Sequence, residues 1–327
     1  MKLLSKFVSL FSTPPPPPPE VGEGLNRIGE LFGPSVANER NFERRLAEPV
    51  ANALSYCDRL VAALPPSIDI HRAAFAENPL VHALFASADD IPLTLARSAA
   101  LREYMEQPQA WLDDHFHALL AARRHEKKVL GAANRGQMIA TDVPQRLLYF
   151  SDQAMTLPAA DEAGARARLR QAAFDSLLQS FVSHLDTLRH GREDLLVERE
   201  LERVRLRTSR DAEMQERYAR RLDELDARLR ADSDALQPEH QIGALAELLM
   251  APEQALSMAP LSFRVDRAGK LVEGEAPAGE PLHTLSFIEL TSRDRRRHVV
   301  LPVRIPREDL TRALEQARVE RDRIVLI

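Results

Sequence analysis

The sequence predicts a mainly α-helical protein: a multi-helix body with a long charged, partly coiled-coil-like helix, followed by a small C-terminal α+β domain of β-β-β-α-β order. Three observations support this prediction. The chain is rich in Ala, Leu, Arg and Glu, which favour helices. Apolar residues recur at helical spacing through much of residues 23–188. From residue 261 onwards, apolar and polar residues alternate with the period of two that is typical of strands.

The composition excludes several classes of protein. With 327 residues, the chain is long enough for about two folded domains. Its 44 basic and 49 acidic residues nearly balance, which excludes nucleic-acid binding by bulk positive charge. A hydrophobic content of 44% excludes a wholly disordered chain, and no apolar run approaches the ~20 residues of a membrane span. The single cysteine, Cys57, excludes an internal disulfide framework and favours the cytoplasm.

Residues 1–12 predict an amphipathic helix. Its apolar face consists of Leu3, Leu4, Phe7, Val8, Leu10 and Phe11, and its other face carries Lys2 and Lys6. Such a helix is typical of docking to a protein partner or, peripherally, to the inner face of a membrane. The alternative is a frayed terminus or a helix that packs on its own domain. A secretory signal fits poorly, because Lys6 interrupts the apolar stretch.

Residues 13–22 predict a stiff spacer. Pro14 to Pro19 are consecutive prolines, which adopt a polyproline II rod of about 3 Å per residue. A rod of this kind would hold the N-terminal helix away from the main body.

Residues 23–188 predict a helical domain with a short β-leaning insertion near 136–157, either a small hairpin or an irregular crossover. The pair Pro65–Pro66 is expected to end the first long helical segment. A later helix is expected to begin at Pro108 and to carry Trp111, Leu112, Phe116, Leu119, Leu120 and Leu130. A long helix is expected from Asp161–Glu162, because acidic residues suit the positive end of a helix dipole.

Residues 189–236 predict a long charged helix or a coiled coil. Acidic residues precede Arg by four positions at several points, and each such pair stabilises an exposed helix by about 0.3 kcal/mol. A heptad frame is interrupted at Thr208, Asp211 and Gln215, and its seam holds Leu201, Val204, Tyr218, Leu222, Leu225 and Leu229. The last four of these predict self-association as a homodimer or contact with a partner. The alternative is a monomeric helix bent back on the body.

Residues 237–260 predict a linker with a short helix at 241–250, and residues 261–327 predict the small α+β domain. Strands are expected at 261–265, 283–291 and 298–305, followed by a helix from Pro306 and a last strand at 323–327. Pro302 argues for an edge position in the sheet, because proline cannot donate to a ladder. The apolar final residues are expected to pair within the sheet.

Two clusters of charged side chains are candidates for a metal-binding or an anion-binding site. Asp113, Asp114 and His117 would share one face of the helix expected there, as half of a metal site completed from another helix. The alternative is a solvated helix face, because no second carboxylate–histidine pair stands out. The densest basic spot suits a phosphate or an acidic partner, with a solvated hairpin tip as the alternative, and it consists of Arg293, Arg295, Arg296 and Arg297.

The sequence favours a non-catalytic interaction or scaffold protein over an enzyme, with docking of residues 1–12 to an unidentified protein partner or a membrane surface. No phosphate-cradling loop, dinucleotide fingerprint or catalytic-serine elbow is found, so no cofactor is expected. A metal-dependent enzyme using the Asp113, Asp114 and His117 face is one alternative. Weak nucleic-acid or phosphate binding through the Arg293–His298 tip is the other. Nucleic acid is not expected as a partner, because acidic residues are interleaved with the basic ones.

Overall fold

The computed structural model describes residues 18–135, 138–272, 281–292 and 296–325. The predicted N-terminal helix at 1–12 lies outside the described residues, as do Arg293 and Arg295. Within the described ranges, no helix is both long and apolar enough to cross a membrane.

The chain forms two compact units, and each is built from two separate stretches of sequence. The helical unit comprises the residues up to Tyr56 together with Ser176–Pro252. The sheet unit comprises Cys57–Asp175 together with the residues from Glu253 onwards. Helices α4 (Phe42–Ala62) and α9 (Glu162–Thr208) contribute residues to both. The units therefore interleave along the chain, unlike the consecutive segments expected from the sequence.

The described part of the helical unit contains portions of α4 and α9 and four further helices: α2 (Pro19–Phe32), α3 (Pro34–Ala37), α10 (Ala212–Ala235) and α11 (Pro238–Met250). Helix α2 begins at Pro19, a position that suits proline because its missing N–H would have no helical partner. The predicted spacer therefore extends no further than Pro18. Asn52 Nδ2 of α4 donates to the Leu249 carbonyl at 2.9 Å, which ties α4 to the end of α11.

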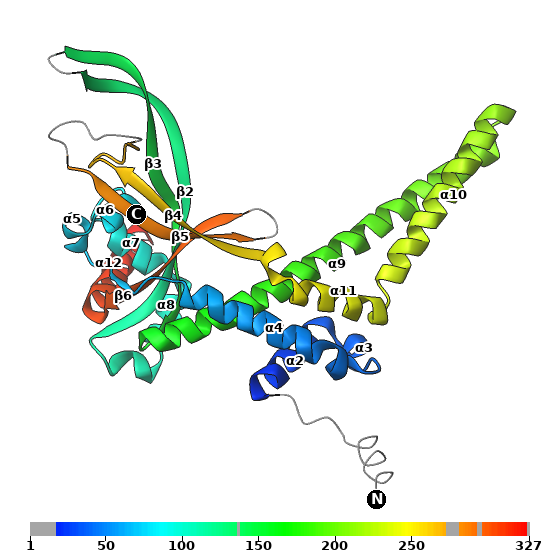
Figure 1. Cartoon of the computed structure of the whole chain (residues 1–327), viewed down its shortest axis with the longest axis horizontal. Helices are drawn as coiled ribbons and strands as arrows, with labels where there is room; N and C mark the ends of the chain where they lie inside the picture. Colours follow the sequence, from blue (N-terminus) through cyan, green and yellow to red (C-terminus); the bar gives the residue numbers. More distant parts are fainter. Residues whose placement is uncertain (1–17, 136–137, 273–280, 293–295, 326–327) are drawn as a thin grey trace, which may run out of the picture. The chain divides into compact units, whose positions relative to one another are not determined.

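Six strands form one sheet in the order β3-β2-β6-β5-β4, with β1 beside β6 (Figure 1). The strands are β1 (Ile68–Asp69), β2 (His115–Arg135), β3 (Met138–Ala159), β4 (Leu256–Val265), β5 (His283–Ser292) and β6 (Arg297–Pro306). Only β1 is parallel to its neighbour among the described pairings. The predicted fold is therefore wrong, because the C-terminal strands form one large sheet with β2 and β3 instead of a separate small domain. Of the residues that the structure describes, 60% are helical and 25% lie in strands.

The core of the sheet unit lies between one face of the sheet and a set of short helices. These elements are α5 (Ala74–Glu77), α6 (Pro79–Leu84), α7 (Asp90–Arg97), α8 (Ala99–Met105) and α12 (Arg307–Val325). Alternate residues of β2 and β6 face this core, among them the fully buried Leu120 and Val303. Tyr104 of α8 packs on Phe116 of β2 with ring centroids 5.5 Å apart. The core thus joins residues from both stretches of the unit.

The helix predicted from Pro108 is wrong. Only Pro108–Trp111 forms a short 3-10 helix (η1), and β2 follows it. Leu120 faces the core, whereas the adjacent Leu119 is buried on the opposite face of the sheet. A strand buried on both faces loses its alternation, so its apolar residues can also match helical spacing. The β-leaning insertion is correspondingly longer than predicted, since it begins with β2 at His115 and ends with β3 at Ala159.

Strands β2 and β3 continue past the rest of the sheet as a two-stranded ribbon (Figure 1). Strand β2 pairs with β6 only over His115–Ala122, and beyond that its described partner is β3. The β2–β3 pairing shifts register at three points, and a β3 residue with positive φ lies at each one: Asp142 (61°), Asp152 (54°) and Leu157 (52°). Bulges of this kind bend a ribbon and increase its twist.

Strand β6 lies in the middle of the sheet, contrary to the edge position predicted from Pro302. Pairing with β5 ends at Val300, and pairing with β1 begins at Val303, so Pro302 lies in the gap between these neighbours. The Arg304 carbonyl accepts from the N–H of Ile70, which directly follows β1. Because alternate residues of a strand direct their backbone groups to the same neighbour, the backbone of Pro302 also faces the β1 side of β6. The proline therefore interrupts no ladder. The predicted last strand is also wrong, because the described residues up to Val325 belong to α12.

Candidate functional site

The charged segment folds into an antiparallel hairpin of α9 and α10 (Figure 1). Helix α9 ends at Thr208, and its hydroxyl donates to the Val204 carbonyl at 3.0 Å. Helix α10 begins at Ala212, where the Asp211 side chain caps it by accepting from the Glu213 N–H at 2.9 Å. Two residues that interrupt the heptad frame, Thr208 and Asp211, therefore mark the turn of the hairpin.

The leucine seam of the hairpin is formed within one chain. Leu225 and Leu229 of α10 are buried against Leu195 of α9. Tyr218 and Leu222, on the same helix, are half-buried. Of the four residues expected to mediate self-association, Leu225 and Leu229 are therefore covered by their own chain.

Ion pairs accompany the leucine seam. Arg221 of α10 donates to Glu198 of α9 at 2.7 Å, and Arg199 pairs with Asp226 at 3.4 Å. Both pairs link the two helices, and in both the α9 residue lies within four positions of Leu195. They help to fix the register of α10 on α9.

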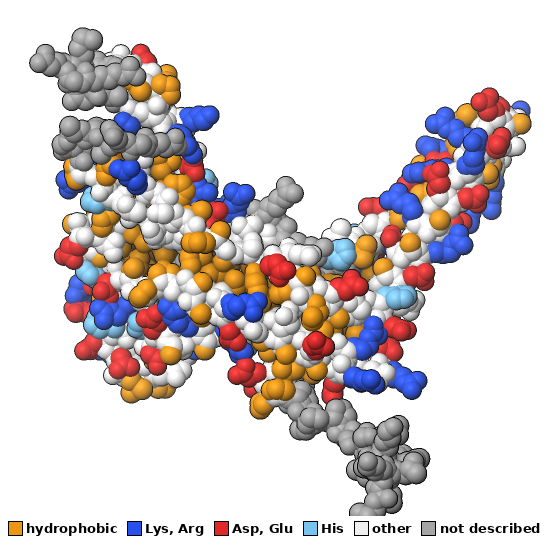
Figure 2. Space-filling model, viewed as in Figure 1, with side chains coloured by type: hydrophobic (Ala, Val, Ile, Leu, Met, Phe, Trp, Pro, Cys, Tyr) orange, Lys and Arg blue, Asp and Glu red, His pale blue; other side chains and the backbone are white. Residues whose placement is uncertain are grey.

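The side of α9 that faces away from α10 carries exposed apolar residues. Val197, Leu201 and Val204 are 72%, 49% and 54% exposed. They recur at i, i+4 and i+7, so they share one helix face, here called the α9 stripe. Buried Leu195 lies about 200° around the helix from Val197, because each residue turns an α-helix by about 100°. Figure 2 shows charged side chains of both signs over most of the hairpin, with hydrophobic side chains among them.

Charges of opposite sign lie at the two ends of the α9 stripe. Glu193 and Asp194 precede it, Arg207 and Arg210 follow it, and all four residues are exposed. Within the described part of the chain, none of these four side chains forms an ion pair or a hydrogen bond. Each end of the stripe therefore offers charged groups that another molecule could engage.

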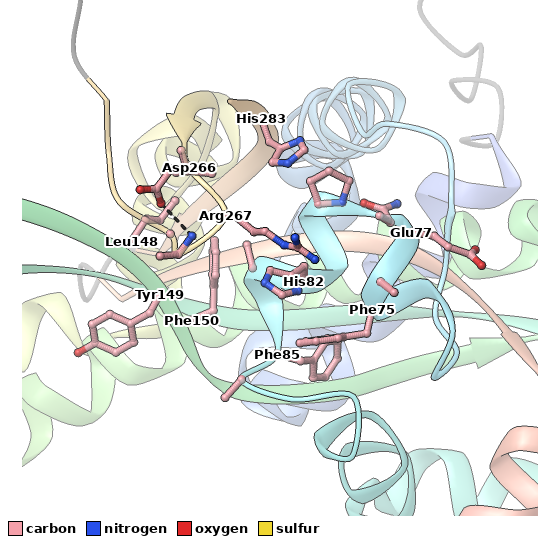
Figure 3. A pocket seen from close by; sticks show the side chains of 18 residues that line it. Phe75, Glu77, His82, Phe85, Leu148, Tyr149, Phe150, Asp266, Arg267 and His283 are labelled. Carbon is pink, nitrogen blue, oxygen red and sulfur yellow. Dashed lines mark hydrogen bonds between the residues drawn. The ribbon is translucent and has the colours of Figure 1, made fainter. Parts of the chain in front are cut away.

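A cavity of about 510 Å³ opens in the sheet unit beside α5, α6, β3 and the turn after β4 (Figure 3). Its lining includes three phenylalanines and three basic residues: Phe75, Phe85, Phe150, His82, Arg267 and His283. The His82 ring on α6 packs on Phe75 with centroids 4.5 Å apart. Glu77 and Asp266 also line the cavity, so the charged side chains beside its apolar walls are of both signs.

The turn that carries Arg267 is held in one conformation. Asp266 Oδ1 accepts from the backbone N–H groups of Ala268 and Lys270, both at 2.9 Å. Gly269 has a φ of 78°, and a Cβ at this position would lie 2.9 Å from the Leu148 carbonyl oxygen. The turn therefore requires glycine, because any side chain would strain the backbone and meet β3.

The alternative of a metal site at Asp113, Asp114 and His117 required a shared helix face, but these residues lie in a bend and in β2. Asp114 pairs with Arg307 at 3.3 Å. His117 Nδ1 lies 3.2 Å from the Ser67 hydroxyl, and burial lowers the pKa of the imidazole. Among the residues described, no three His, Cys, Asp or Glu side chains are placed to share a metal ion.

Two candidate nucleophiles, Cys57 and Ser151, lie outside the lining of the cavity. Cys57 is fully buried, and this burial raises the pKa of its thiol to about 12. His125 Nε2 lies 2.8 Å from the Ser151 hydroxyl on the β2–β3 ribbon, but neither residue lines the cavity. In the described ranges, these groups place no nucleophile and base together in the cavity.

The predicted basic tip lies only partly within the described residues. Arg297 begins β6, and the Arg296 carbonyl accepts from the Ser292 N–H at 3.1 Å, which closes the end of the β5–β6 loop. Since Arg293 and Arg295 lie outside those residues, anion binding at this tip stays a prediction.

No family model, no curated protein and no solved structure matches this chain. Its function is therefore inferred from its own residues. The exposed α9 stripe, flanked by charges that have no partner in the described structure, is the strongest candidate for a functional surface.

Proposed function

We propose that this chain is a non-catalytic interaction protein whose α9–α10 hairpin presents the α9 stripe to another protein molecule. The observation that supports this proposal is the exposure of Val197, Leu201 and Val204, at 72%, 49% and 54%. Single exposed apolar side chains are common on proteins, but a stripe at i, i+4 and i+7 is typical of a helix that packs on another helix. Burial of this stripe would contribute about 25 cal/mol per Å² of apolar area.

We also propose that residues 1–12 form a second docking element, which works in the cytoplasm on a protein partner or on the inner face of a membrane. Its support is the sequence pattern, in which Leu3, Phe7 and Phe11 share an apolar face and Lys2 and Lys6 lie opposite. A chain whose single cysteine is buried is also compatible with a reducing compartment.

A cysteine placed in the α9 stripe should be protected from thiol reagents where the stripe is bound. The test compares Leu201→Cys with Ala219→Cys, an exposed control position on α10. Native Cys57 can stay in place, because burial and a pKa of about 12 keep its thiol unreactive near neutral pH. In an extract of the cells that make the protein, we expect maleimide labelling at position 201 to be about tenfold slower than at 219.

The comparison is repeated on denatured protein to correct for intrinsic reactivity. If the two cysteines are labelled equally fast in the extract, and also in purified protein at high concentration, the α9 stripe is free in solution and this function is wrong.

Deletion of residues 1–17 should abolish docking by the N-terminal element. The deletion ends there because α2 begins at Pro19, so the described helical unit is kept whole. We expect the full chain, but not the deleted one, to float with phosphatidylglycerol-containing vesicles or to retain a co-purifying protein. A double variant, Phe7→Ser with Phe11→Ser, keeps both lysines and removes much of the apolar face. Equal flotation and equal retention by the full and deleted chains would contradict this part of the proposal.

A further inference from the structure

The charge on α9 changes sign at the α9 stripe. On its N-terminal side, residues 193–200 contain four acidic residues and one Arg. On its C-terminal side, residues 203–208 contain three Arg and no acidic residue, and Arg210 follows in the turn. The apolar residues lie across this boundary, so the surface has an acidic half and a basic half.

We infer that the occupant of the α9 stripe is the same stripe of a second copy of this chain, with the two α9 helices antiparallel; this inference rests on the proposed function. An antiparallel pair brings the acidic half of each helix onto the basic half of the other. A two-fold axis between Glu200 and Leu201 places Val197 opposite the partner's Val204, and Asp194 opposite the partner's Arg207. Both contacts occur twice, because an interface with two-fold symmetry repeats every pair.

The charges needed for this pairing are available. Asp194 and Arg207 are exposed, and neither forms an ion pair within the described residues. Charges nearer the middle of the stripe are already paired within α9, since Glu200 binds Arg203 at 2.8 Å and Glu202 binds Arg205 at 2.5 Å. The groups without a partner are thus those that the second copy would meet at the two ends of the interface.

Other arrangements fit these charges less well. Two parallel copies would place acidic residues on acidic residues and Arg on Arg, which is repulsive. A nucleic acid would be attracted by the basic half of the stripe and repelled by the acidic half. The antiparallel pair also leaves the leucine seam of the hairpin intact, because Leu225 and Leu229 pack on the side of α9 opposite the α9 stripe. The result is a four-helix arrangement in which the two α9 helices form the centre.

Exchanging charges at the two ends of the stripe tests both the partner and its orientation. Two single variants of the full chain, Asp194→Arg and Arg207→Asp, each place like charges in contact in their own dimer. Mixed with each other, they form two attractive pairs per heterodimer. We expect wild type to dimerise, each single variant to dimerise about tenfold more weakly, and the mixture or the double variant to recover.

Self-association is measured by light scattering and sedimentation over about 1–100 μM protein, at low and high salt. High salt should weaken the wild-type dimer and reduce the difference between the variants, because the exchanged charges are exposed. Circular dichroism shows that each variant is folded. Leu201→Glu serves as the disruptive control, since it places a charge in the middle of the apolar contact.

Each outcome separates this inference from the proposed function. If wild type is monomeric throughout while Leu201→Cys is protected in the cell extract, a different protein covers the stripe and the second copy is excluded. If wild type dimerises but the mixed variants do not recover, the antiparallel register is wrong. If position 201 is unprotected everywhere, the proposed function itself fails.

Discussion

Replacing Leu225 with Ala should destabilise the α9–α10 hairpin by about 2–4 kcal/mol, because it leaves a cavity in a seam that α9 and α10 close together. Leu225 is fully buried against Leu195 of α9, in a cluster that also contains Leu229 of its own helix. The loss is measured as weaker hydrogen-exchange protection of the α10 backbone amides, a local readout that does not require the whole chain to unfold.

Leu201→Ala is the matched control for this experiment. It removes the same side-chain atoms from the exposed face of α9, so the stability of the hairpin should change by less than about 0.5 kcal/mol. The two variants should therefore affect different properties. Leu225→Ala lowers the stability of the hairpin, whereas Leu201→Ala lowers the affinity of dimerisation. If instead Leu225→Ala weakens dimerisation and Leu201→Ala weakens the hairpin, the seam of Leu225 and Leu229 joins two chains.

Replacing Arg124 with Met should lower the free energy of unfolding of the sheet unit by about 3–5 kcal/mol. Glu289 of β5 is only 7% exposed, and its Oε1 accepts from Arg124 Nε of β2 at 2.9 Å. The Arg124 guanidinium also lies over the Phe263 ring, 5.2 Å from its centroid. Removing the guanidinium leaves a buried carboxylate without its cation, which is the costly way to break an ion pair. Chemical denaturation followed by circular dichroism measures the loss.

Arg123→Met is the control for Arg124→Met, because Arg123 directly precedes Arg124 on β2. Its ion pair with Asp152, at 3.6 Å, is largely exposed. It should cost less than about 1 kcal/mol. Adding Glu289→Leu to Arg124→Met should recover most of the lost stability, since an apolar pair replaces the isolated charge. Equal losses for Arg123→Met and Arg124→Met would show that burial of Glu289 is not what makes the pair important.

Parts of the fold can be predicted from local pattern alone. The strands expected at 261–265, 283–291 and 298–305 are confirmed as β4, β5 and β6, with ends that differ by a few residues. The start of α9 at Glu162 is also confirmed, and Asp161 Oδ1 accepts from the Gly164 N–H at 2.6 Å as a helix N-terminus requires. In these places the residues that fix the element are close together in the sequence.

The missed strand β2 shows where local pattern fails. Its Ala and Leu residues favour helices, and over Phe116–Ala122 it is buried on both faces, so neither propensity nor alternation indicates a strand there. What makes it a strand is pairing with β6, whose residues come much later in the chain. The alternative of a metal site at Asp113, Asp114 and His117 also depended on a helix, and tertiary contacts replace that helix by β2.

The candidate surface could be found only in part from the sequence. Leu201 and Val204 fall on the heptad frame, but the frame assigns them to the same seam as Leu225 and Leu229. Only the reversal of the chain after Thr208 separates the two sets, because it brings Leu225 and Leu229 onto the opposite side of α9 from Leu201. Val197 lies one heptad before Val204, so the same frame, continued toward the N-terminus, includes all three residues of the α9 stripe.

The position of β6 also sets the order in which the protein can be completed during synthesis. Strand β6 begins at Arg297, long after β1 and β2 in the sequence, yet it pairs with both of them and with β5. In the nascent chain, the β2 edge at His115–Ala122 stays unpaired by β6 until this later strand has been synthesised. Core residues such as Leu120 cannot pack against β6 before that point. Closure of the sheet unit therefore joins strands that are far apart in the sequence, which is typical of slow folding. A product released before Arg297 lacks the strand that connects the two halves of the sheet.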